Sequence, residues 1–178
     1  MPSLILASKS KVRKDILNKN NISCIIELSN VDEDLVKESL LNEGATPEII
    51  SKNLAELKAN KVSQKKNGEI VLGADSVIDL EGKIISKPID RKQALDILKK
   101  LNGKKHYLIS SVCISKNGSM IWNYTDKAAL TMKKMSDEEL KEYLEKISDE
   151  ALFSNIEGDE DTIMGLPVKK IKEYINSL

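Results

Sequence analysis

The sequence EIVLGADSVIDLEGKIISKP, residues 69–88, decides the fold that we expect and contains the first candidate functional residue. Its apolar run at residues 70–72 predicts a buried strand, which then presents Asp75 and Ser76 before the apolar pattern resumes. An ionised carboxylate in a buried strand is costly unless a cation, hydrogen-bond donors or water lie beside it. The stretch therefore predicts a central strand with a functional or ion-paired carboxylate at Asp75.

The residues that follow predict a hairpin that returns towards this carboxylate. Residues 79–83 have the composition of a tight turn, and residues 84–85 predict a short strand that ends at Lys87. We expect the hairpin to bring Lys87 towards Asp75. A carboxylate that can hold a divalent metal or activate water, facing an ammonium that can neutralise phosphate, suits pyrophosphate chemistry. A simple ion pair at a strand edge is an equal alternative at this point.

The composition is that of an ordinary globular domain. Lys+Arg and Asp+Glu both number 28 among 178 residues, and aromatic residues make up only 3%. No global positive charge and few stacking side chains are therefore available, so we do not expect nucleic acid as a partner. The start lacks the pattern of a signal peptide, and no apolar run approaches the ~20 residues that span a bilayer. We expect a cytoplasmic protein without a membrane partner.

A second candidate region lies near the N-terminus. Residues 4–7 predict a strand, and Ser10 is a good N-cap for a helix over residues 11–18. Ser8, Ser10 and Arg13 then lie where a strand gives way to a helix N-terminus, whose N–H groups and dipole favour anions. The alternative is simple capping with Arg13 on the solvated surface, and this segment alone favours that alternative.

The rest of the chain predicts further helices and strands without a repeat or a linker. The expected order of elements is β α β α α β β α β β α α, which indicates a mixed α/β sheet with helices on its faces, within one domain over residues 1–178. Cys24 and Cys113 have no second Cys or His at metal-ligand spacing and are expected to be buried free thiols. His106 is the only histidine and is expected to be structural. We expect further strands over 22–26, 106–115 and 119–132, the last two joined by a hairpin at Asn117 and Gly118. An acidic turn at 31–34 leads into a helix that ends at about Leu41, and further helices are expected over 48–65, 90–100, 136–146 and 168–175.

A set of short motifs runs through the whole chain. They are LILASKSKVRKDIL at 4–17, VDE at 31–33, LKANK at 57–61, GADSVI at 73–78, KP at 87–88, LNGKKH at 101–106, the helix that opens SDEE at 136–139, and IEGDEDTIMGLP at 156–167. In this order and at this spacing, the motifs resemble the Maf family of nucleoside triphosphate pyrophosphatases. Each motif alone is weak, but together they are specific.

The resemblance implies a fold, an activity and a cofactor. The fold would be similar to that of inosine-triphosphate pyrophosphatases: an elongated mixed sheet in two lobes, with the substrate in the cleft between them. The activity would be hydrolysis of a nucleoside triphosphate to the monophosphate and pyrophosphate, dependent on a divalent metal such as Mg²⁺ or Mn²⁺. A homodimer is also plausible from the resemblance.

The resemblance also assigns roles to individual residues. Asp75 matches the family's proton acceptor, and Glu33 matches an acidic position near the metal. Because an Asp with an ordinary pKa of ~3.9 is a weak base, metal assistance at Asp75 is more plausible than unaided proton abstraction. The residues that match the family's phosphate-binding positions are Ser8, Ser10, Arg13, Lys58 and Lys87.

The sequence departs from the family in two places. Family members usually carry Pro-Arg where this chain has Lys11 and Val12; Val12 leans towards the branch linked to 7-methylguanosine triphosphate and away from thymidine or uridine triphosphates. Between Ala151 and Leu152 we cannot find a Gly-containing loop that helps to build the cleft. We hypothesise that the protein carries a mobile segment there that this sequence omits, which a measured mass equal to that of the 178 residues would contradict.

Two functions therefore stay open at this stage. The first is a pyrophosphatase that clears noncanonical or surplus nucleoside triphosphates. The alternative is a nucleotide-binding or nucleic-acid-binding regulator of septum formation or cell division on the same fold. Retention of Asp75, Glu33, Lys58 and Lys87 favours the enzyme, whereas the missing loop favours the alternative.

Overall fold

The computed structural model describes residues 3–146 and 166–178, and the element order agrees with the prediction. The segment around Ala151 and Leu152 and residues 156–165 of the motif at 156–167 lie outside the described residues. The elements are β1 (Leu4–Leu6), α1 (Lys11–Lys19), β2 (Cys24–Ile26), α2 (Glu33–Asn42), α3 (Pro47–Ser63), β3 (Ile70–Leu80), β4 (Lys83–Ile85), α4 (Arg91–Leu101), β5 (Lys105–Lys116), β6 (Ser119–Thr131), α5 (Asp137–Glu145) and α7 (Val168–Ser177).

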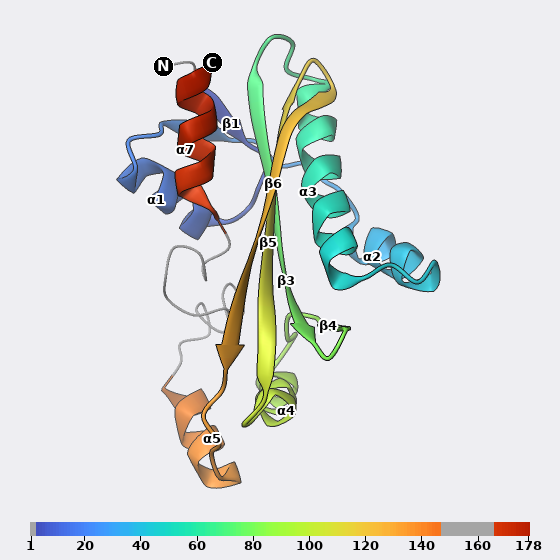
Figure 1. Cartoon of the computed structure of the whole chain (residues 1–178), viewed down its shortest axis with the longest axis vertical. Helices are drawn as coiled ribbons and strands as arrows, with labels where there is room; N and C mark the ends of the chain where they lie inside the picture. Colours follow the sequence, from blue (N-terminus) through green and yellow to red (C-terminus); the bar gives the residue numbers. More distant parts are fainter. Residues whose placement is uncertain (1–2, 147–165) are drawn as a thin grey trace.

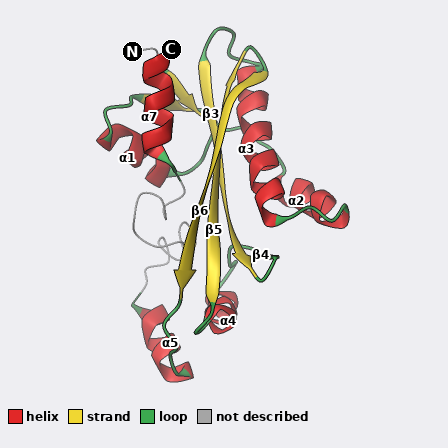
Figure 2. Ribbon diagram, viewed as in Figure 1, coloured by secondary structure: helices red, strands yellow, loops and turns green. Residues whose placement is uncertain are grey.

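The strands, drawn in yellow in Figure 2, form one mixed sheet in the order β2-β1-β3-β5-β6. β1 pairs in parallel with both β2 and β3, whereas β3, β5 and β6 form antiparallel pairs. The short β4 also pairs with β3, antiparallel and off the main path. The predicted mixed α/β sheet is therefore confirmed, with β3 as its central strand.

Both predicted hairpins are confirmed. The turn between β3 and β4 places Glu81 and Gly82 at φ values of 54° and 84°, and the turn between β5 and β6 places Asn117 and Gly118 at 52° and 83°. Consecutive positive φ values are typical of the tight two-residue turns that suit the twist of antiparallel strands. These turns fix the register of the long strands and hence the position of each side chain along β3.

Helices cover both faces of the sheet in an elongated molecule (Figure 1). α3 packs on one face, where Ala55, Ala59 and Val62 meet Val71 of β3 and Cys113 of β5. The opposite face is covered at the same end by α1 and α7, whose buried side chains join those of β1 and β3 in the largest core cluster. Farther along the sheet, α4 packs beside β3 and β5. β3, β5 and β6 thus run from one end of the molecule to the other.

The sheet has a notch along one side of β3. β1 pairs with residues 70–72 of β3, and β4 pairs with residues 78–80. Between these two segments, no described strand pairs with residues 73–77 on the β1 side, whereas β5 pairs with them continuously on the other side. Asp75 and Ser76 lie in this notch, which opens where β1 ends and the chain turns into α1.

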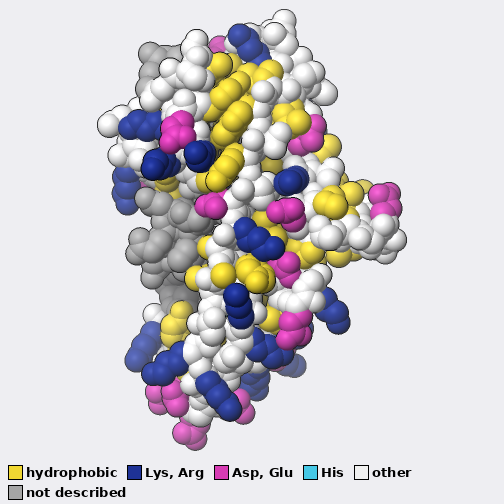
Figure 3. Space-filling model, in the orientation of Figure 1, with side chains coloured by type: hydrophobic (Ala, Val, Ile, Leu, Met, Phe, Trp, Pro, Cys, Tyr) yellow, Lys and Arg dark blue, Asp and Glu magenta, His cyan; other side chains and the backbone are white. Residues whose placement is uncertain are grey.

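The surface charges are mixed. On the face shown in Figure 3, lysine and arginine side chains are interspersed with acidic ones. This agrees with equal numbers of Lys+Arg and Asp+Glu in the sequence. Any strong affinity for an anion must therefore come from a local cluster.

Two smaller expectations need correction, and one is supported. Cys24 is only partly buried, because its strand β2 lies at the edge of the sheet, whereas Cys113 in the centre is buried as predicted. β2 is shorter than the strand expected over 22–26: it begins at Cys24, so Ile22 and Ser23 are not part of it. His106 is buried, as a structural residue should be. No helix among the described residues has the length and apolarity to cross a membrane.

Gly73 allows the close approach of α3 to β3. A Cβ atom placed on Gly73 would lie 2.2 Å from the carbonyl oxygen of Ala55 and 2.8 Å from the backbone N of Ala59. Both contacts are with the helix backbone, which cannot move aside as a side chain can. Any larger residue at position 73 must therefore push α3 away from the strand that carries Asp75.

We predict that Gly73→Ala lowers the free energy of unfolding by about 3 kcal/mol or more, because the methyl group overpacks the contact between helix and strand. Denaturant unfolding measures this loss. Gly68→Ala is the control, since its added Cβ meets nothing within 4 Å and only the φ of +76° is unfavourable. That variant should lose about 1 kcal/mol, and equal losses in the two variants would contradict the tight-contact interpretation.

We also predict that His106 weakens the protein in mild acid. Burial lowers the pKa of His106 below its ordinary value of 6.5, although a hydrogen bond with the Lys104 backbone partly opposes this shift. The unfolded chain therefore binds the proton more readily, and stability should fall as the pH drops below 6.5 towards the folded-state pKa. His106→Gln should show a smaller fall in Tm between about pH 7.5 and about pH 5.5. Identical pH profiles for the two proteins would contradict this assignment.

Candidate functional site

A cleft of about 730 Å³ opens at the notch in the sheet. One wall is the turn from β1 into α1, the other is formed by α3 and the start of α2, and β3 and β4 line the floor. The cleft brings together every site residue that the sequence predicted: Ser8, Ser10, Arg13, Glu33, Lys58, Asp75 and Lys87.

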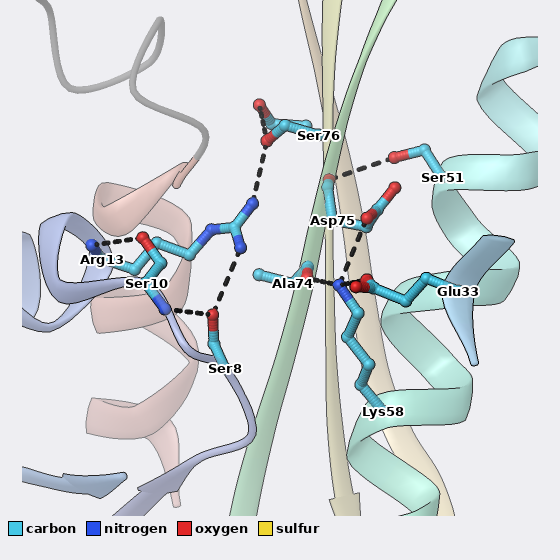
Figure 4. Close-up of polar contacts among 10 residues, drawn as sticks. Ser8, Ser10, Arg13, Glu33, Ser51, Lys58, Ala74, Asp75 and Ser76 are labelled. Carbon is cyan, nitrogen blue, oxygen red and sulfur yellow. Dashed lines mark hydrogen bonds and ion pairs between the residues drawn. The ribbon is translucent and has the colours of Figure 1, made fainter. Parts of the chain in front are cut away.

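Asp75 is held by Lys58, which reaches it from α3 (Figure 4). The Asp75 and Lys58 side chains are only 12% and 9% exposed, and Nζ of Lys58 lies 3.2 Å from Oδ1 of Asp75. Lys58 also donates to the carbonyl oxygen of Ala74 at 3.1 Å and forms an ion pair with Glu33 at the start of α2. The lysine therefore joins two carboxylates and the backbone of the central strand.

The backbone and the second oxygen of Asp75 differ in their contacts. The Ser51 hydroxyl of α3 donates to the Asp75 carbonyl oxygen at 3.1 Å, which fixes the strand backbone at this point. By contrast, Oδ2 of Asp75 is buried and has no hydrogen-bond partner among the described residues. A buried carboxylate oxygen without a donor is unfavourable in the folded protein. It is a position that a ligand, a water molecule or a cation could occupy.

The two carboxylates differ in their electrostatic setting. Burial raises the pKa of Asp75 above its ordinary value and outweighs the nearby positive charges of Lys58 and Arg13. Burial alone would also raise the pKa of Glu33, but the charge and hydrogen bond of Lys58, with Lys87 and Arg13 further away, lower it. Asp75 is therefore the better proton acceptor, and Glu33 is the more firmly ionised group.

Lys87 lies in the same cleft as Asp75, as the hairpin predicted. Within the described residues, Lys87 forms no ion pair with Asp75, and its charge acts on Glu33 instead. The β3–β4 hairpin does bring Lys87 into the cleft, but Lys58 of α3 is the cation that contacts Asp75. The strand-edge ion pair that we considered thus exists, and its partner comes from a helix that lies earlier in the chain.

The N-terminal turn combines capping with a buried arginine. Ser10 accepts a hydrogen bond from the Arg13 N–H at 3.2 Å, which confirms its N-cap role. Ser8 accepts from the Ser10 N–H at 3.1 Å and from Nη1 of Arg13 at 3.3 Å. Arg13 is 8% exposed, so the surface position that the segment alone favoured is wrong. The helix turns this side chain inward, towards β3.

The residues fit a divalent metal as a partial set of ligands. Throughout residues 3–146 and 166–178, no group of three or more His, Cys, Asp and Glu side chains could hold a metal ion by itself. Mg²⁺, however, is commonly bound by one or two carboxylates together with substrate phosphates and water. Glu33 and Asp75 both contact Lys58, and Oδ2 of Asp75 has no described partner, so the pair matches that mode.

Sequence reasoning did not identify several side chains that shape the site. No sequence pattern singles out Ser51 or Ser110, and none assigns a role to Ser76. In the structure, Ser51 donates to the Asp75 carbonyl oxygen. Ser76 is hydrogen-bonded to both Arg13 and Ser110. Lys58 could not be separated from other lysines of its helix before the family resemblance was used. In the structure, Lys61 on the same helix donates to the Asn30 carbonyl oxygen at 2.8 Å instead of entering the ion-pair group.

Comparisons with known proteins agree with this geometry. The family model described as "Maf-like protein" matches residues 3–178. A protein of Pelagibacter ubique named "Nucleoside triphosphate pyrophosphatase" is 70% identical, over 97% of this chain and 96% of its own. A Brucella abortus protein named "7-methyl-GTP pyrophosphatase" is 34% identical, over 93% of this chain and 90% of its own.

The alignments and a solved structure add two points. The Pelagibacter alignment spans 187 positions, more than the 178 residues of this chain, so that relative carries residues where this chain has none. A solved structure titled "Structure of a HAM1 protein from Coxiella burnetii" covers 100% of both chains with a TM-score of 0.53 and 10% identity. At that identity the likeness shows the fold alone.

We predict that Lys58→Met lowers the free energy of unfolding by about 3–5 kcal/mol, because it leaves the carboxylate of Asp75 buried without its cation. Adding Asp75→Asn to that variant should restore most of the loss, since the amide carries no charge. Lys61→Met is the matched control on the same helix and should change stability by less than about 1 kcal/mol. If the double variant were no more stable than Lys58→Met, the buried charge would not be the cause. Denaturant unfolding at neutral pH measures all four proteins.

Proposed function

Because the chain belongs to the Maf-like protein family, we propose that it is a hydrolase of acid anhydrides that cleaves nucleoside triphosphates to the monophosphate and pyrophosphate. The observation that carries this proposal is the buried Asp75–Lys58 pair, which shares one cleft with the turn between β1 and α1. A carboxylate of raised pKa next to several cations suits attack by water on a polyphosphate. The names of the Pelagibacter and Brucella relatives support the same reaction class.

The cations of the cleft would bind the phosphates. Arg13 enters from α1, Lys58 from α3 and Lys87 from the end of β4, so positive charge lies on three sides of the notch. Ser8 and Ser10 add hydroxyl groups at the N-terminus of α1, where the helix dipole also favours an anion. Together these groups would offset the negative charge of a triphosphate and hold its chain in one orientation.

Asp75 would act on the attacking water. Because burial raises its pKa, this carboxylate accepts a proton more readily than an exposed aspartate does. Lys58 keeps the carboxylate in place and moderates that shift, and Ser51 fixes the strand beneath it. Asp75 would thereby orient the water and accept its proton.

A divalent cation, Mg²⁺ or Mn²⁺, completes the proposal. Glu33 and Asp75 would hold it, with the substrate phosphates as further ligands. When bound, such a cation polarises the phosphorus–oxygen bond and lowers the pKa of water. Glu33 suits this role because the surrounding cations keep it ionised.

The preferred substrate, the cellular location and the oligomeric state are further parts of the proposal. Val12 lines the cleft where the family usually carries an arginine, and one relative is named for 7-methyl-GTP. We therefore propose modified or noncanonical triphosphates as preferred substrates. We further propose that the protein acts in the cytoplasm, where nucleoside triphosphates are made and used, and that it forms a homodimer.

We predict metal-dependent release of pyrophosphate from a panel of 7-methyl-GTP, UTP, TTP, CTP and inosine triphosphate. Asp75→Asn should lower kcat by about 10²–10⁴-fold, the usual contribution of a general base. A chelator should abolish release, and added Mg²⁺ or Mn²⁺ should restore it. The assay is best run on protein whose mass has been measured, so that the loop around Ala151 is known to be present or absent.

Asp79→Asn is the matched control for Asp75→Asn. Asp79 lies on the same strand, but its carboxylate accepts a hydrogen bond from the Gly82 N–H in the hairpin instead of lining the cleft. Its kcat should stay within about twofold of the wild-type value. If the folded wild-type protein released no pyrophosphate from any substrate, the enzyme would be excluded and the nucleotide-binding regulator would be favoured.

A further inference from the structure

A pair of serine hydroxyls lies on the face of β3 opposite to Asp75, where the half-buried Ser76 lines the cleft and Ser110 lies beneath it. Ser76 of β3 and Ser110 of β5 are direct partners in the antiparallel register, and their Oγ atoms are 3.2 Å apart. Ser110 is 1% exposed. Successive residues of a strand point to opposite faces, so Ser76 lies on the α1 side and Asp75 on the α3 side. The two serines therefore belong to neither the ion-pair group nor the cleft wall that α3 forms.

Ser76, the first serine of this pair, contacts the guanidinium of Arg13 (Figure 4). Nη2 of Arg13 donates to Oγ of Ser76 at 3.1 Å, and Nη1 donates to Oγ of Ser8 at 3.3 Å. A guanidinium only donates, so the Ser76 oxygen accepts from it, and a hydroxyl oxygen has a second lone pair and a proton for a further hydrogen bond. Arg13 and Ser110 are thus joined through Oγ of Ser76, and either serine can be the donor in the bond between the two hydroxyls.

This arrangement fixes the plane of the guanidinium. The side chain of a free arginine loses rotamer entropy when it binds a ligand. Here two hydroxyls from different elements, Ser8 after β1 and Ser76 on β3, contact two different nitrogens of the same planar group. A single contact would let the group rotate about that nitrogen, whereas two contacts define its orientation. Ser110 in turn limits the rotation of the Ser76 hydroxyl.

We propose that Ser110 is a positioning residue, which acts through Ser76 to orient Arg13 for binding the phosphates of the substrate. Ser110 touches no substrate itself. This inference rests on the proposed function, because it needs Arg13 to bind phosphate. It adds Ser110 of β5, which does not line the cleft, to the residues that determine the phosphate affinity of the site.

The test compares variants of Ser110 by steady-state kinetics and by calorimetry with pyrophosphate. Ser110→Ala should raise KM and the Kd for pyrophosphate about fivefold, the factor expected from weakening one hydrogen bond, and should change kcat less than twofold. Ser110→Val should behave in the same way. Ser110→Thr keeps the hydroxyl and should stay within about twofold of the wild-type protein for both constants. A merely structural serine would not separate KM from kcat in this pattern.

Ser115→Ala is the matched control. Ser115 lies on the same strand, is also fully buried, and donates to Oδ1 of Asn60 at 2.6 Å outside the cleft. Its removal should lower Tm as Ser110→Ala does, yet leave KM and Kd unchanged. Equal increases of KM in Ser110→Ala and Ser115→Ala would overturn the proposal, because they would show a general loss of stability.

A double-variant cycle tests whether Ser110 acts through Arg13. In an Arg13→Ala background, Ser110→Ala should have no further effect on KM or on the Kd for pyrophosphate. Effects that multiply in the double variant would overturn the proposal, since Ser110 would then act independently of the arginine.

The two readouts separate this inference from the proposed function. If the wild-type protein hydrolyses triphosphates but Ser110→Ala binds pyrophosphate as tightly as the wild-type protein, this inference fails and the proposed function stands. If the wild-type protein binds pyrophosphate without hydrolysing any triphosphate, the proposed function fails, and the Kd values of the variants still decide the role of Ser110. If the wild-type protein neither binds nor hydrolyses, Arg13 binds no phosphate and both proposals fail.

Discussion

The buried ion pair between Lys58 and Asp75 is the interaction on which the rest of the site depends. A carboxylate at the centre of a sheet needs a cation close by, and here the cation comes from a helix that crosses the strand at very short range. Gly73 makes this crossing possible, because any side chain there would collide with the backbone of α3. The close packing of α3 on β3 therefore also places the cation that balances the charge of Asp75.

The notch in the sheet explains why the functional groups gather where they do. The pairing of β1 with β3 ends at Leu72 and that of β4 with β3 begins at Ile78, so the part of β3 that carries Asp75 and Ser76 has a strand partner on one side only among the described residues. Lys58 contacts this stretch from one face of the sheet and Arg13 from the other, as Figure 4 shows. Two neighbouring residues of one strand thereby contact two different cations: Asp75 contacts Lys58, and Ser76 contacts Arg13.

The site also retains a buried carboxylate in an unfavourable environment. Oδ2 of Asp75 is buried without a described hydrogen-bond partner, and burial holds the pKa of this carboxylate above its ordinary value. Both features disfavour the ionised form in the protein by itself, and both would be relieved by a cation or by an ordered water. Functional sites commonly retain such unfavourable groups, because a ligand uses them when it binds.

The sequence by itself determined the order of elements, the two hairpins and Asp75 as the residue to examine, because these follow from local patterns: apolar period, turn residues and a charge inside an apolar run. With the family motifs, it also supplied a candidate set whose members all line the cleft: Ser8, Ser10, Arg13, Glu33, Lys58, Asp75 and Lys87. Only the tertiary structure decided that Lys58 and not Lys87 contacts Asp75, that Arg13 is buried, and that Ser110 is hydrogen-bonded to Ser76, which contacts Arg13. These contacts join residues distant in sequence, such as Lys58 with Asp75 and Arg13 with Ser76. The crossing of α3 over β3 creates the first contact, and the pairing of β1 with β3 brings Arg13 to Ser76. The register of β3 with β5 places Ser110 opposite Ser76. No local segment of the sequence determines these arrangements.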